Sequence, residues 1–198
     1  MHWGFDPADD EGWTAGGDPL PVAAPPDATL LCDDGVVELA AGQSVSSDAP
    51  LGSPTTTVLV LGTPSAPGTV LSFLAADGGA DVVVDGLDVA VRAWADDGVP
   101  VTVATGTLDD GLVHVLAVTV NGTDVTLWAD GGSTADSLPA ALTGALGGAG
   151  FGLGTLASLD PSDAVATAGF TATELAVVGG TLTDAQLEAL HAAAVPAA

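Results

Sequence analysis

The sequence predicts an all-β domain in which two antiparallel sheets form a sandwich, followed by one short C-terminal helix. Hydrophobic residues make up 47% of the 198 residues, which is enough to bury a single core. Runs rich in Val and Thr alternate with Gly, Pro and Asp, as expected for short strands joined by turns. Asp outnumbers Glu by 22 to 4, and Asp favours turns whereas Glu favours helices.

The chain is expected to divide into an extended arm (residues 1–28) and a sandwich (residues 29–198). Five of the 13 prolines lie in the arm, where they rigidify the backbone and remove hydrogen-bond donors. The arm also carries Trp3, Phe5 and Trp13. These aromatic side chains either fold back onto the sandwich or bind a neighbouring subunit, and their tendency towards burial favours the first arrangement.

Strand patterns recur from residue 30 onwards. Strands are expected at 36–39, 56–61, 69–75, 81–84, 87–94, 99–105, 113–120 and 124–128. Asp85-Gly86 and Asn121-Gly122 join consecutive strands and are typical of tight hairpin turns. Residues 87–94 alternate strictly, with one apolar face and with Arg92 and Trp94 together on the other face.

One helix is predicted, beginning after Thr183. Thr183 and Gln186 have the spacing of a capping box, and Leu182 and Leu187 that of a hydrophobic staple. Leu187 and Leu190 form an apolar stripe, and Pro196 ends the helix. We expect the helix to close one end of the sandwich like a lid.

The charge composition excludes several partners. The net charge is -25, Lys is absent and Arg92 is the single arginine, so nucleic acids and anionic membranes are not expected partners. Cys32 is the single cysteine and has no intrachain partner. Residues 1–6 lack the pattern of a Sec signal, and no apolar run has the length of a membrane span.

Residues 110–131 (DGLVHVLAVTVNGTDVTLWADG) resemble the signature hairpin of laminin-G-like, concanavalin-type domains. The recurring positions of that hairpin are occupied here by His114, Ala117, Gly122, Trp128, Asp130 and Gly131. The resemblance extends over about residues 56–190 and includes Gly152-Leu153-Gly154 and the helix start Leu182-Thr183-Asp184-Ala185. Val113 departs from the pattern, since the family has Trp there.

The resemblance implies a jelly-roll sandwich. Members of the family act as glycan- or protein-binding modules, as parts of glycosidases, or as structural components that include phage virion proteins. Fold alone does not choose among these roles.

No catalytic centre is expected. Glycosidases need two carboxylates across a cleft, but the four glutamates are scattered at Glu11, Glu38, Glu174 and Glu188. The histidines, His2, His114 and His191, are dispersed as well, and His114 is expected to be a hydrogen-bonded structural residue.

Two binding sites are candidates. Related domains often bind calcium through Asp at a loop rim, which makes Asp130, Asp160 and Asp163 candidate ligands, along with the pairs Asp96-Asp97 and Asp109-Asp110. With so many aspartates, a solvated acidic surface is the simpler interpretation. Trp94 and Arg92 could bind a glycan by stacking and hydrogen bonding; the favoured alternative is that Arg92 pairs with one of the many aspartates, beside a Trp94 at the edge of a sheet.

We expect a non-enzymatic structural or interaction protein, specifically a phage virion component such as a capsid decoration or a minor tail or fibre protein. Its partners would be other virion proteins or its own copies, and no cofactor besides calcium is expected. It would be made in the host cytoplasm and located in the virion; the alternative is a cytoplasmic or cell-surface location reached without Sec. The alternative function is a glycan-binding, lectin-like adhesion module, and a glycoside-active enzyme is the second alternative.

Overall fold

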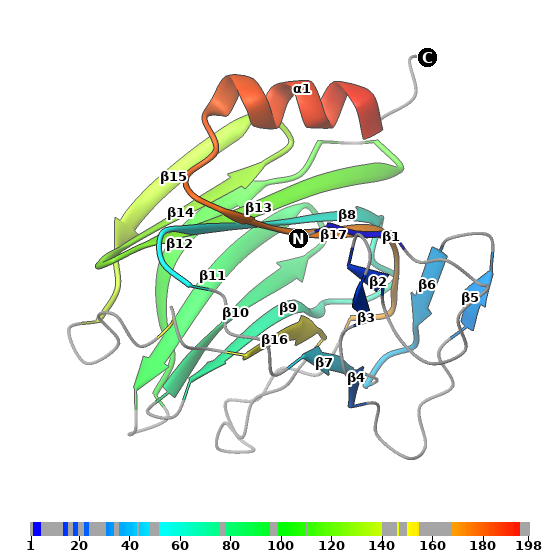
Figure 1. The fold of residues 1–198 in the computed structure, drawn as a ribbon, viewed down its shortest axis with the longest axis horizontal. Helices are drawn as coiled ribbons and strands as arrows, with labels where there is room; N and C mark the ends of the chain where they lie inside the picture. The colour runs from blue at the N-terminus through cyan, green and yellow to red at the C-terminus, as the bar shows by residue number, and fades with distance from the viewer. Residues whose placement is uncertain are drawn as a thin grey trace.

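The computed structural model describes residues 2–4, 14–15, 18–19, 22–23, 31–33, 36–42, 44–47, 52–75, 78–95, 99–109, 111–139, 146, 150–154 and 168–194. These residues form two antiparallel sheets that face each other, with one helix on the outer side of the larger sheet (Figure 1). The predicted sandwich with a single short C-terminal helix is therefore confirmed for the described part of the chain.

The ten-stranded sheet runs, from edge to edge, through β15 (Gly132–Ser137), β14 (Asp124–Ala129), β13 (Val113–Asn121), β8 (Thr55–Gly62), β17 (Phe170–Gly179), β1 (His2–Gly4), β2 (Thr14–Ala15) and β3 (Asp18–Pro19). In the same sheet, β6 (Val36–Leu39) pairs with β17 and with β5 (Leu31–Asp33). The seven-stranded sheet has the order β12 (Val101–Thr107), β11 (Asp88–Ala95), β10 (Gly78–Asp85), β9 (Gly68–Ala75), β16 (Gly150–Leu153), β7 (Val45–Ser47) and β4 (Val22–Ala23).

The first residues belong to the larger sheet. The backbone of β1 pairs antiparallel with β17, with Trp3 opposite Leu175 and Gly4 opposite Glu174. A boundary between arm and sandwich near residue 28 stays a prediction.

The core lies between the two sheets and follows the alternation of the strands. The inward side chains of β13 are Leu116, Val118 and Val120, and each is at most 4% exposed. Val89, Val91 and Ala93 of β11 face them from the other sheet, as the alternation predicted. Burial of these aliphatic side chains is the main favourable contribution to folding.

The hairpin turns differ in detail from the expectation. Gly122 has a φ of 62° and Gly86 a φ of 64°, and each is the first of two turn residues, so Asn121 and Asp85 remain paired strand ends. Glycine adopts this left-handed conformation without steric cost. Strand β15 was not predicted, because all six of its residues are exposed and no apolar pattern marks it.

The helix α1 (Asp184–Ala194) begins as predicted. Gln186 N–H donates to Thr183 Oγ1 at 3.4 Å, and Thr183 N–H donates to Gln186 Oε1 at 2.9 Å, which completes the capping box. The expected lid over one end is wrong: α1 lies flat on the outer face of the ten-stranded sheet (Figure 1). Leu187 is buried there in a cluster with residues of the sheet, and Leu182 packs against that cluster. The physical reason is that this face is apolar beneath the helix.

Leu187 should account for most of the binding energy of the helix to the sheet. Leu187→Ala removes a side chain that is 3% exposed, so we expect the free energy of unfolding to decrease by about 3 kcal/mol in urea denaturation. Leu190→Ala is the matched control, because Leu190 is 43% exposed and should cost less than about 1 kcal/mol. Equal losses would contradict this docking of the helix.

Candidate functional site

The outer face of the ten-stranded sheet is divided into two halves. The half under α1 is apolar and consists of Val58, Val60, Val115, Ala117 and Trp128, all 7% exposed or less. These residues come from β8, β13 and β14, which are neighbours in the sheet.

The other half of this face is polar, and α1 does not cover it. On β13 the outward residues change from Val115 and Ala117 to Thr119 and Asn121. On β14 the outward residues opposite them change from Trp128 to Thr126 and Asp124. The register aligns the two changes, so the polar residues form one continuous surface.

This surface contains an open groove of about 430 Å³, which we call the polar groove. It is lined by Thr119, Asn121, Asp124, Thr126, Ala135, Asp136, Ser137 and Thr181. Asn121, Asp124, Asp136 and Ser137 are exposed. The lining therefore presents carboxylate and amide oxygens, amide N–H groups and hydroxyls to solvent, which is the hydrogen-bonding chemistry that sugar hydroxyl groups need.

The boundary between the two halves is set by Thr56 on β8. Its Oγ1 donates to the carbonyl of Gly180 at 3.0 Å and accepts from the N–H of Leu182 at 3.2 Å. It also bonds to Thr119 Oγ1 at 2.9 Å. These bonds fix the segment that leads into α1, so the helix extends over the apolar half only.

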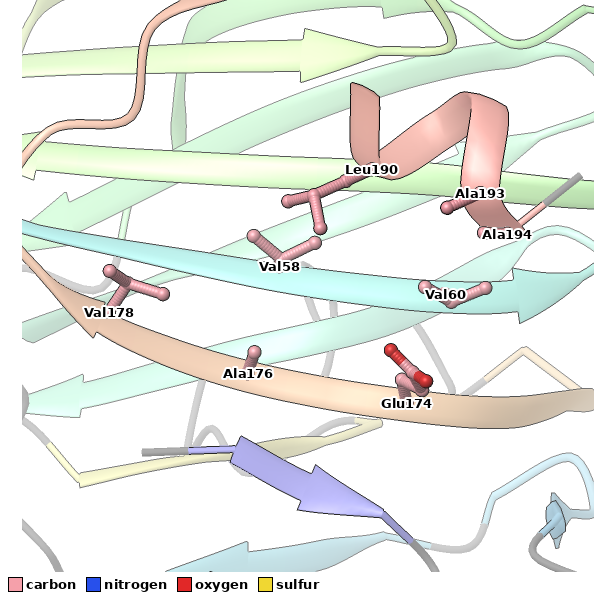
Figure 2. A pocket seen from close by; sticks show the side chains of 8 residues that line it. All are labelled: Val58, Val60, Glu174, Ala176, Val178, Leu190, Ala193 and Ala194. Carbon is pink, nitrogen blue, oxygen red and sulfur yellow. The ribbon is translucent and has the colours of Figure 1, made fainter. Parts of the chain in front are cut away.

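A second groove, of about 420 Å³, lies beside the helix, which we call the apolar groove (Figure 2). Leu190, Ala193 and Ala194 line it from α1, and the valines and alanine of β8 and β17 line it from below. Glu174 is the single charged residue of this lining.

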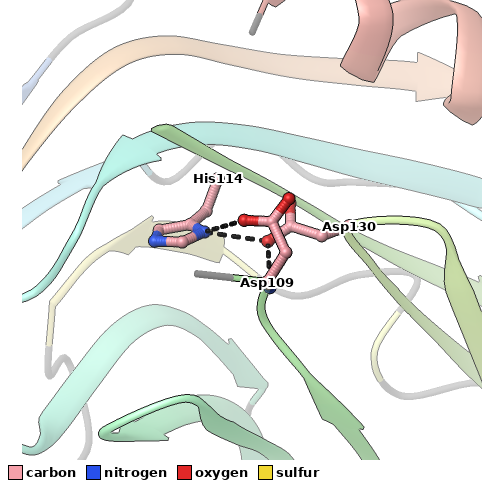
Figure 3. Close-up of side chains that lie close together, drawn as sticks. All are labelled: Asp109, His114 and Asp130. Atoms are coloured by element: carbon pink, nitrogen blue, oxygen red, sulfur yellow. Dashed lines mark hydrogen bonds and ion pairs between the residues drawn. The ribbon is translucent and has the colours of Figure 1, made fainter. Parts of the chain in front are cut away.

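Asp130 is the centre of a polar cluster in which its own side chain and that of His114 are buried and that of Asp109 is exposed (Figure 3). His114 Nδ1 lies 2.8 Å from Asp130 Oδ2, and the backbone N–H of Asp109 donates to the same oxygen at 3.1 Å. The N–H of Val115 donates to Asp130 Oδ1 at 2.8 Å. His114 is fully buried, and its Nε2 bonds to Thr63 Oγ1 at 3.2 Å, which confirms the expected structural histidine.

Calcium, the metal considered from the sequence, finds little support around Asp130. The carboxylate is 1% exposed on its side chain and already accepts three N–H groups. The residues close enough to share a metal with it include a histidine, a ligand that calcium does not favour. Asp160, Asp163, Asp96, Asp97 and Asp110 lie outside the described residues, as do Phe5 and Trp13, and Trp3 is described by its backbone alone.

The glycan-binding role considered for Trp94 and Arg92 is not supported by their surroundings. Trp94 is 4% exposed and packs over Gly79, where an added Cβ would lie 2.6 Å from the indole ring. Stacking on a sugar needs an exposed indole face, and this burial removes it. Arg92 donates from Nε and Nη2 to the two oxygens of Asp81, so the alternative interpretation, an arginine paired with an aspartate, describes the site.

The Asp81 carboxyl is nearly fully buried beneath this ion pair. Burial raises the pKa of Asp81 above its usual 3.8, although the hydrogen bonds and the charge of Arg92 act in the opposite direction. Thr69 Oγ1 lies 3.4 Å from the same carboxyl group.

Comparison with solved structures identifies the fold. Domain 4 of AbnA, an extracellular GH43 arabinanase from Geobacillus stearothermophilus solved with arabinotriose, aligns with a TM-score of 0.69 at 20% identity, over 96% of both chains. The CBM40 of the Ruminococcus gnavus IT-sialidase, solved with α2,3-sialyllactose, has a TM-score of 0.60 at 15% identity and covers 79% of this chain and 96% of its own. These neighbours are binding domains rather than catalytic domains.

The receptor-binding domain of botulinum neurotoxin type G aligns over 96% of this chain, with a TM-score of 0.66 at 10% identity. The chain spans about half the length of the toxin binding domains that it matches. No protein-family model matches the sequence, and no curated protein sequence matches it. In the described residues, α1 is too short and too polar to cross a membrane.

Loss of Arg92 should expose the cost of burying Asp81. In Arg92→Gln the carboxylate stays buried without its cation, so we expect the free energy of unfolding at about pH 7 to fall by about 3–5 kcal/mol. A carboxyl group with a higher pKa in the folded than in the unfolded chain binds protons preferentially when folded, so its contribution to stability increases as the pH falls.

Arg92→Gln loses the hydrogen bonds and the charge that lower the pKa of Asp81, so the variant gains more stability than the parent as the pH falls. The difference in free energy of unfolding between parent and variant should therefore shrink between about pH 7 and about pH 4.5, measured by urea denaturation of the two proteins in parallel. Asp88→Asn, an exposed carboxylate at the start of β11, is the control and should change stability little at either pH. A deficit that is constant with pH would show that Asp81 is not the cause.

Proposed function

We propose that this chain is a non-catalytic glycan-binding module whose ligands are neutral oligosaccharides bound in the polar groove. The observation that carries the proposal is the groove itself: a solvent-accessible surface of hydroxyl, amide and carboxylate groups on a sheet face whose other half is sealed by α1. Sugar hydroxyl groups both donate and accept hydrogen bonds, and carboxylates bind them through charge-assisted bonds.

The solved neighbours support this class of ligand. Domain 4 of AbnA was solved with arabinotriose, and it matches this chain along nearly the full length of both. The sialidase module was solved with a sialylated sugar, and another toxin binding domain with SialylT.

The charge of the chain favours neutral over sialylated ligands. The net charge is -25, and the groove lining carries Asp124 and Asp136 and no cation. A sialic acid carboxylate would be repelled, whereas a neutral sugar would not. The virion role expected from the sequence stays a prediction, and a virion protein with this groove would also adhere to glycans.

Binding to arabinotriose, measured by isothermal titration calorimetry, tests the proposal together with a screen of neutral glycans on an array. Wild-type protein should bind a neutral oligosaccharide and should not bind sialyllactose. Asp124→Ala and Asp136→Ala should each weaken binding at least roughly tenfold, the value of one lost charged hydrogen bond. Asp88→Ala, an exposed aspartate on the other sheet, is the matched control and should leave affinity unchanged.

Two results would contradict the proposal. The first is an absence of binding to every neutral glycan on the array. The second is binding that both groove variants leave intact, which would place the ligand elsewhere on the sandwich.

A further inference from the structure

Two threonines of the polar groove come from different segments and are held in different ways. Thr119 is part of β13, whose backbone pairs with β8 and with β14. Thr181 lies in the segment between β17 and α1, outside any strand or helix, and is exposed. The pairing of strands therefore fixes Thr119, whereas the position of Thr181 depends on the bonds of the residues on either side of it.

Thr56 holds the backbone on both sides of Thr181. Its Oγ1 donates to the carbonyl of Gly180 at 3.0 Å and accepts from the N–H of Leu182 at 3.2 Å. These two residues are the chain neighbours of Thr181, so one hydroxyl group fixes the chain before and after it. Thr56 itself is fully buried and is not part of the groove lining. It reaches this segment because β8 lies between β13 and β17 in the sheet.

The same hydroxyl group decides what Thr119 offers to a ligand. A hydroxyl group has one hydrogen to donate and two lone pairs that accept. The hydrogen of Thr56 goes to Gly180, and one of its lone pairs accepts from Leu182. The bond of 2.9 Å to Thr119 Oγ1 must therefore use the other lone pair, which makes Thr119 the donor. The oxygen of Thr119 can then only accept a bond from a ligand.

We propose that Thr56 is a positioning residue of the polar groove, which holds Thr181 in place and fixes Thr119 as an acceptor. The inference rests on the proposed function of the groove and adds a requirement for its ligand. The carboxylates of Asp124 and Asp136 are acceptors as well when they are ionised. A sugar with free hydroxyl groups supplies donors to this lining, whereas a sugar whose hydroxyl groups carry methyl groups does not.

Calorimetric titration with arabinotriose, or with the neutral oligosaccharide that binds best on the array, tests the role of Thr56. Thr56→Val keeps the shape of the side chain and removes its hydroxyl group, so we expect affinity to fall at least roughly fivefold, the contribution of about one hydrogen bond. Thr56→Ser retains the hydroxyl group and should bind like the parent. Thr57→Val is the matched control and should leave affinity unchanged, since Thr57 is also buried but lies opposite the core residue Val118.

A second variant separates positioning from a general loss of stability. Thr181→Ala should weaken binding by itself. Thr56→Val should then cost less affinity in the Thr181→Ala background than in the parent, because the side chain that Thr56 positions is already gone. A general loss of stability would give equal costs in the two backgrounds. Without any sugar, the amide hydrogen of Leu182 should exchange with solvent faster in Thr56→Val than in the parent, measured by NMR.

The outcomes distinguish this inference from the proposed function. A parent protein that binds no neutral oligosaccharide contradicts the proposed function, and this inference with it. A parent that binds, with affinity unchanged in Thr56→Val or in Thr181→Ala, overturns this inference alone.

Both variants should remain folded, which thermal unfolding verifies. Thr181 is exposed, and in Thr56→Val the N–H of Gly180 keeps its bond to the carbonyl of Pro54 at 2.8 Å. If Thr56→Val does not fold, the affinity of Thr181→Ala decides between the two results.

Discussion

A sheet in a sandwich has two faces, and only one of them is covered by the other sheet. In this protein one part of the outer face of the ten-stranded sheet is apolar, and α1 covers that part. The other features of this face follow from that constraint. The helix begins just after the segment that the hydroxyl of Thr56 fixes, and the polar groove lies where the helix is absent. His191 reaches Asp130 because the helix lies flat on the sheet.

Asp130 connects three segments that are distant in the sequence. It follows β14 in a hairpin turn, with a φ of 41° that few residues other than glycine adopt. Its carboxylate accepts N–H groups from the segment after β12 and from β13, and it contacts the imidazole of α1. A buried carboxylate is stable only when such donors surround it, so the turn, the strand and the helix depend on one another.

The extreme acidity of the chain limits what each site can be. With a single arginine, which is bonded to Asp81, the described surface offers sugar hydroxyls and metal cations many acceptors and offers anions very little. The sandwich itself, shared with binding domains at no more than 20% identity, does not choose a ligand. The choice lies with the residues of the outer face.

The sequence by itself determined the local features. Strict alternation placed Arg92 and Trp94 on one face of β11, the dipeptides ending in Gly86 and Gly122 located the hairpins, and Thr183 with Gln186 located the helix start. The dipeptide Asp130-Gly131, which forms the turn between β14 and β15, was the one feature of the sequence that indicated β15. Each of these signals lies within a few residues, where local conformation is decided by steric and hydrogen-bonding preferences.

Tertiary structure alone decided the sites. The burial of Trp94, the joining of Asp124 and Asp136 in one groove, and the contact of His191 with Asp109 all depend on strand order, register and helix docking. Those are set by packing between residues far apart in the chain, with β8 between β13 and β17 as the clearest case. The period of a strand states which face a side chain occupies, but it does not state which other strand lies beside it.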